Sequence, residues 1–101
     1  MARARSKPAG VWALLTADAI TGLQRRSGMS TEEMVQGAGL SSPYYLKRAA
    51  GVLPYTLNDI EAIATVLQVT PLEIATLAAQ LADDSVATST TEQAAGASRV
   101  L

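Results

Sequence analysis

The chain contains no cysteine, no histidine and no phenylalanine. Without cysteine and histidine it has no thiol nucleophile, no disulfide, no imidazole for acid–base catalysis and none of the usual zinc ligands. We therefore expect that the protein is not an enzyme and that it binds no metal and no cofactor. Tryptophan occurs once and tyrosine three times, so a core must be built mainly from Leu, Ile, Val, Met and Ala.

Strand patterns and long apolar runs are also lacking. No β-branched or aromatic residues alternate with polar ones between turn signals, which favours an all-α fold. No apolar run approaches the ~18 residues of a membrane helix. The apolar stretch 11–15, which follows Arg3 and Arg5, is shorter than the ~7–15 residues of a signal peptide. We expect a cytoplasmic, nucleoid-associated protein that does not bind membranes.

The charge is distributed unevenly. Residues 1–51 hold seven cations and three anions, whereas residues 52–101 hold one cation and six anions. The formal net charge is only −1. A basic half can still dock on phosphates when the whole chain is slightly acidic.

Capping signals predict where helices begin. The segment Ser30-Thr31-Glu32-Glu33 has the pattern of a capping box, in which a serine and a glutamate satisfy each other's backbone amides. The segment Thr70-Pro71-Leu72-Glu73 has the same capping-box pattern, and Thr56 with Asp59 has a weaker form of this pattern. Apolar spacing predicts a first helix over 11–27, and a fourth helix whose stripe faces the core (Leu57, Ile60, Ile63, Ala64 and Leu67).

A tight turn separates the second and third predicted helices. Gly39 suits the left-handed residue that ends a helix, Ser42 can cap the next one, and Pro43 fits its first turn. The third helix then runs over 43–50 and stops at Gly51. Two short helices joined in this way predict a helix-turn-helix, whose second helix enters the DNA major groove.

The third helix has two conceivable registers. Without an extra turn residue, Tyr45 and Arg48 face inward, which buries a cation at a cost of several kcal/mol unless it is paired. With one extra residue, Leu46 and Ala49 face inward, and the outward residues are Ser42, Pro43, Tyr44, Lys47 and Arg48. We predict the second register because it buries the apolar pair.

The order of these motifs resembles a known family. The segments 24–34, 38–41, 51–57 and 60–74 are similar to the phage-repressor-type (xenobiotic-response-element, Cro/repressor-like) helix-turn-helix domain, over about residues 15–77. The resemblance implies a compact five-helix domain that binds operator DNA, usually as a dimer. Thr31 stands where the family commonly has a glutamine that contacts a phosphate.

The predicted function is a sequence-specific DNA-binding transcriptional regulator, of the kind of a phage or mobile-element repressor. Lys47, Arg48 and Tyr44 are the candidate base readers. Thr31, Ser41 and Ser42 can donate hydrogen bonds to phosphates as well as cap their helices, and Pro43 is on the outward, DNA-facing side of the third helix. Arg25 and Arg26 either flank the DNA backbone or complement the dipole of the first helix, and Arg3 and Arg5 belong to an arm that either enters a minor groove or has no role.

The domain organisation follows from composition. Residues 1–10 form a basic, flexible arm, residues 11–82 the helix-turn-helix domain, and residues 83–101 a flexible tail rich in Ser, Thr and Ala. The apolar face of the last helix is a candidate homodimer surface (Leu72, Leu77, Ala78 and Leu81). The alternative function is a protein-interaction module of the antitoxin or antirepressor type, which would use this face of helix 71–82.

Overall fold

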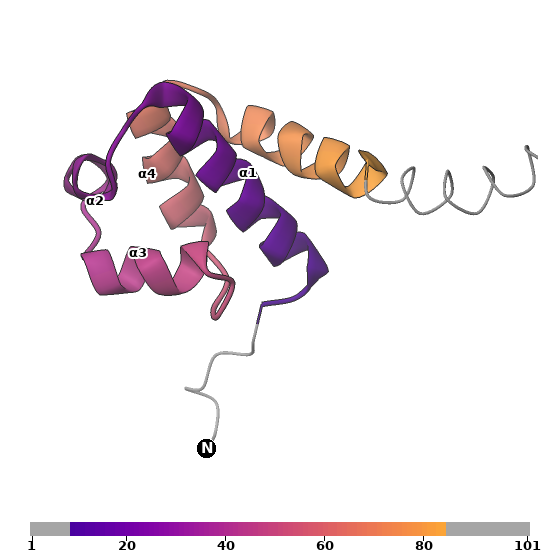
Figure 1. Cartoon of the computed structure of the whole chain (residues 1–101), viewed down its shortest axis with the longest axis horizontal. Coiled ribbons are helices and arrows are strands. Elements are labelled where there is room, and N and C mark those ends of the chain that lie inside the picture. Colours follow the sequence, from indigo (N-terminus) through magenta and orange to yellow (C-terminus); the bar gives the residue numbers. More distant parts are fainter. Residues whose placement is uncertain (1–8, 85–101) are drawn as a thin grey trace, which may run out of the picture.

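The computed structural model describes residues 9–84, which form five helices and no strand. They are α1 (Val11–Ser27), α2 (Thr31–Ala38), α3 (Ser42–Ala49), α4 (Leu57–Leu67) and a fifth helix, Pro71–Asp84. The predicted all-α, compact five-helix fold is confirmed (Figure 1). The fifth helix includes Asp83 and Asp84, which the sequence assigned to the tail; the rest of that tail and arm residues 1–8 lie outside the described residues.

The capping signals act as the sequence predicts at three helix starts. The Ser30 hydroxyl accepts a hydrogen bond from the Glu33 amide at 3.1 Å, and the Glu33 carboxylate accepts one from the Ser30 amide at 2.9 Å. Thr56 with Asp59 and Thr70 with Glu73 form the same reciprocal pairs. Each pair satisfies amides that a helix start leaves without a partner.

Every helix contributes to one core. The largest fully buried side chains are Ile20, Met34, Tyr45, Ile63 and Ile74, and they come one from each of the five helices. None of these side chains is more than 1% exposed. No helix can therefore move away without opening apolar surface to water.

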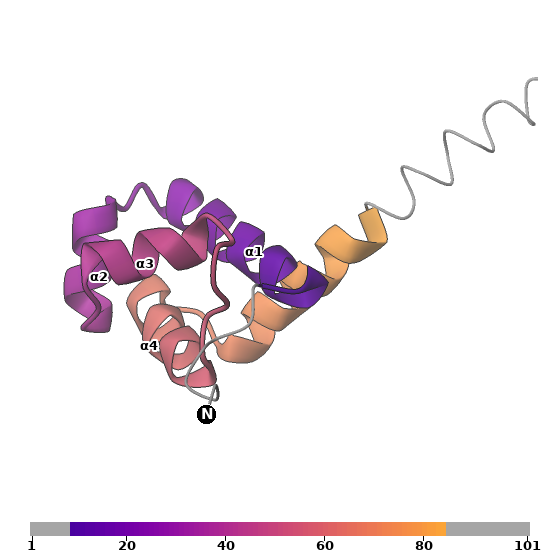
Figure 2. The same cartoon turned by 90° about the horizontal axis from the view of Figure 1, so that it is seen from below.

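The arrangement separates α3 from most of the fifth helix. In Figure 1, α3 lies lengthwise along the lower edge and α2 is seen nearly end-on beside it, so their axes cross steeply. The fifth helix, in orange, runs away from this pair in both views (Figures 1 and 2). The α2–α3 unit and the far end of the fifth helix thus offer two distinct surfaces.

The predicted core stripe of α4 is wrong at Leu57, and the candidate dimer surface of the fifth helix is mostly packed against the core. Leu57 was expected to face the core with the other apolar residues of α4, but it is 85% exposed. It is the first residue of α4 and precedes the part of the helix that packs against the core. In the predicted dimer surface, Ala78 is fully buried and Leu77 and Leu81 pack against the core. Ile74 and Ala78 lie one turn apart and face inward, so only Leu72 of that surface is strongly exposed, at 74%.

No single helix within residues 9–84 is long and apolar enough to cross a membrane. Only α4 and Pro71–Asp84 taken together reach the length and hydropathy of a membrane span, and the axes of these two helices are bent by 101° relative to each other.

Candidate nucleic-acid interface

The turn between α2 and α3 is held by local hydrogen bonds. Gly39 adopts the left-handed conformation at φ 71°, which an L side chain disfavours. The Leu40 amide donates to the Val35 carbonyl at 2.9 Å, and the Leu40 side chain packs against the core. The next residue, Ser41, accepts a hydrogen bond from the Tyr44 amide at 3.2 Å. The start of α3 is therefore fixed relative to the end of α2.

The predicted register of α3 is wrong by one residue. Ser41, not Ser42, is the cap, and Pro43 is the second residue of the helix. As a result Tyr45 is buried, at 1% exposure, and Leu46 is 51% exposed. Ala49 does pack against the core, as expected. The observed register turns Arg48 inward. Burying this cation is costly only if it lacks a partner, and Arg48 has one.

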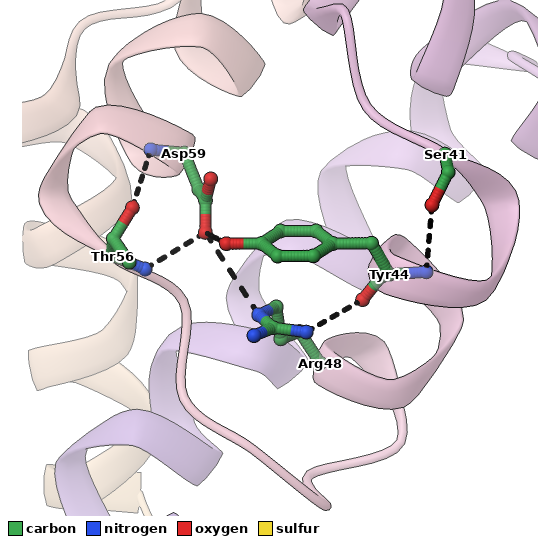
Figure 3. A network of polar contacts seen from close by, with 5 residues as sticks. All are labelled: Ser41, Tyr44, Arg48, Thr56 and Asp59. Carbon is green, nitrogen blue, oxygen red and sulfur yellow. Dashed lines mark hydrogen bonds and ion pairs between the residues drawn. The ribbon is translucent and has the colours of Figure 1, made fainter. Parts of the chain in front are cut away.

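Arg48 has such a partner on α4 (Figure 3). Its side chain is 12% exposed, and Nε lies 4.0 Å from Oδ2 of Asp59. Its guanidinium carbon stands 3.5 Å from the centroid of the Tyr44 ring, and Nη1 donates to the Tyr44 carbonyl at 3.2 Å. The anion, the aromatic face and the carbonyl offset part of the cost of burying this cation, while Nε itself makes no hydrogen bond.

Tyr44 completes the same network. Its hydroxyl donates to Oδ2 of Asp59 at 2.7 Å, which raises the pKa of the phenol because that hydrogen bond favours its protonated form. The amide of Thr56 also donates to Oδ2. One carboxylate oxygen therefore caps α4 and holds α3 against it. The expected outward orientation of Tyr44 and Arg48 is wrong, since both side chains are turned toward Asp59 of α4 (Figure 3). Their role as base readers stays a prediction.

A second polar link joins α3 to α1 and α2. The Tyr45 hydroxyl donates to Oε1 of Gln24 on α1, and Nε2 of Gln24 donates to the Met29 carbonyl at 3.1 Å. The same nitrogen approaches Oγ1 of Thr31 at 3.4 Å. Burial raises the pKa of the Tyr45 phenol, so this hydroxyl stays protonated and can donate. Sequence reasoning missed Gln24, because its partners lie in other helices.

The outward face of α3 is consequently different from the predicted one. Its exposed residues are Ser42, Pro43, Leu46, Lys47 and the cap Ala50. Lys47 is the only cation among them. Ser41 is exposed at the start of the helix, and Thr31 is partly exposed at the start of α2. Four predicted site residues at the start and on the outer face of α3 are therefore exposed, namely Ser41, Ser42, Pro43 and Lys47.

The other predicted cations are placed differently. Arg25 and Arg26 are exposed in the last turn of α1. Arg26 lines a cavity with Leu77 and Gln80 of the fifth helix, whereas Gln24 on the same helix reaches α3. Arg26 thus faces the fifth helix and not α3. Arg3 and Arg5 lie outside the described residues.

Within residues 9–84, no group of three or more acidic side chains is placed to hold a metal ion. Comparisons with protein-family models, with curated proteins and with solved structures give no match.

Proposed function

We propose that this protein is a sequence-specific DNA-binding regulator that places α3 in the major groove. The observation that carries the proposal is the capped turn followed by a helix of which one side is anchored and the other is exposed. Tyr45 and the Arg48–Asp59 contact anchor the inner side. The outer side carries Lys47, whose ammonium group can donate to O6 and N7 of guanine.

Groups suited to phosphate binding lie at the start of α3. The Ser41 hydroxyl accepts from the Tyr44 amide and keeps its own proton free to donate. Ser42 is the first residue of α3, whose first turn has no acidic side chain, so its backbone amides and the helix dipole favour an anion. Such contacts set the position of a helix on the duplex, while the groove-facing side chains select the sequence.

The test is selection from a pool of random duplexes, followed by affinity measurements on the selected site. Lys47→Ala should weaken binding about 5–100-fold if the lysine reads a guanine, and Lys47→Arg should retain most of the affinity because it keeps a donor pair. Affinity should also fall as salt concentration rises. Selection of no consensus, together with an unchanged affinity of Lys47→Ala for any duplex, refutes the proposal.

A second candidate function is supported by a different surface. Among residues 9–84, Leu57 and Leu72 are the two most exposed large apolar residues, at 85% and 74%, and they line one open apolar cavity of about 320 Å³. A protein partner could cover this cavity, as in an antitoxin or antirepressor. Its binding should be nearly independent of salt, and Leu72→Ser should abolish it while leaving DNA affinity unchanged.

A further inference from the structure

Leu46 occupies an unusual place on the outer face of α3. It is the only large apolar side chain of that helix that is strongly exposed, at 51%. It lies one turn after Ser42 and one turn before Ala50, and Lys47 follows it directly. The buried neighbour Tyr45 and the Arg48–Asp59 contact prevent α3 from rotating Leu46 into the core.

The chemistry of Leu46 restricts what it can recognise. A leucine side chain has no donor and no acceptor, so it cannot read the polar edge of any base. In the major groove the apolar group on a base edge is the C5-methyl of thymine. Lys47 beside it has three donors and matches the two acceptors of guanine. The outer face of α3 is thus complementary to a thymine next to a guanine.

We infer that Leu46 determines sequence specificity by packing against the C5-methyl group of one thymine in the bound duplex, while Lys47 contacts a nearby guanine. The inference rests on the proposed function and specifies its target. Ala50, a small residue one turn beyond Leu46, leaves room for the base edge to approach the helix. The exposed half of Leu46 gains a contact only in the complex, so its removal should weaken affinity more than folding.

The experiment removes the methyl group without altering any hydrogen bond of the base. Each thymine of the selected duplex is replaced in turn by deoxyuridine, and the dissociation constant is measured at one fixed salt concentration. For the full-length protein, one position should lose about fourfold in affinity, the value of one buried methyl group. Leu46→Ala should bind the thymine duplex more weakly and should lose nothing further at that position, because the two changes remove the same contact.

Controls separate this contact from other roles. Leu72→Ala removes another exposed leucine, which lies outside α3, and this variant should retain the full deoxyuridine effect. The thermal midpoint of Leu46→Ala should stay close to that of the unchanged protein. Insensitivity to deoxyuridine at every position, or the same sensitivity in Leu46→Ala, overturns the inference and leaves the proposed function intact. A change in oligomeric state on Leu46→Ala would assign this leucine to a protein interface instead, and failure to select any duplex would refute both proposals.

Discussion

Asp59 is the residue whose loss should be most informative about how α3 is held. Its Oδ2 accepts from the Tyr44 hydroxyl and from the Thr56 amide, and it lies 4.0 Å from Nε of Arg48. Asp59→Ala removes a hydrogen bond to a charged group, worth about 1.5–3 kcal/mol. It also removes half of a capping box, worth about 1 kcal/mol. It leaves the Arg48 guanidinium largely buried without an anion.

These contributions share one oxygen and therefore do not simply add. We expect Asp59→Ala to lower the free energy of unfolding by about 3–4 kcal/mol, a large part of the ~5–10 kcal/mol of a domain of this size. Glu73→Ala is the matched control, because Glu73 makes the same capping box with Thr70 at an exposed site. It should cost only about 1 kcal/mol.

Urea denaturation followed by far-ultraviolet circular dichroism measures both variants. If Asp59→Ala unfolds the chain in the absence of urea, Asp59→Asn and Tyr44→Phe allow a double-mutant cycle, which should show a favourable coupling of about 1 kcal/mol or more between the two side chains. Equal destabilisation by Asp59→Ala and Glu73→Ala would refute the reasoning. Asp59 would then be a helix cap and nothing else.

Three further predictions concern backbone conformation and pH. Gly22→Ala should raise stability by about 0.5–1 kcal/mol, because the glycine is inside α1 and an added Cβ would meet no atom within 4 Å. Gly51→Ala should instead lower stability in the same urea assay, since Gly51 has φ +80° and its Cβ would collide with Leu14. The raised pKa of Tyr44 means that the folded state favours the protonated phenol, so its contribution is complete below the ordinary pKa of 10 and is lost as pH rises above it. Tyr44→Phe should therefore show a shallower loss of thermal midpoint in alkaline buffer, and an unchanged slope would contradict the assigned hydrogen bond.

Local features of this fold could be predicted from sequence because their partners are close along the chain. Ser30 and Glu33 satisfy each other within one helical turn, as do Thr70 and Glu73. Gly39 ends α2 for a reason that concerns its own backbone only. These signals place helix starts and ends without knowledge of the tertiary structure.

The register of α3 could not be predicted in this way. Ser41 and Ser42 are equally able to cap a helix, so the local signal does not distinguish them. The choice depends on whether Arg48 finds an anion, and the anion is Asp59 in another helix. The capping pattern already explained Asp59 as the partner of Thr56, so nothing in the sequence indicated that Asp59 also contacts Arg48. The same limitation hid Gln24, which lies 21 residues from its partner Tyr45.

The two adjacent cations of α3 show how strongly the exposed face of this helix depends on the one-residue difference in register. Lys47 and Arg48 carry the same charge and differ by about 100° around the helix axis. Arg48 packs on the Tyr44 ring beside Asp59 and is 12% exposed, so it supports α3 from its inner side. Lys47 and Leu46 occupy the outer face instead. The outer face of α3 is therefore less basic and more apolar than the sequence indicates. If α3 binds DNA as proposed, sequence selectivity should depend on apolar contact with a base as well as on charge.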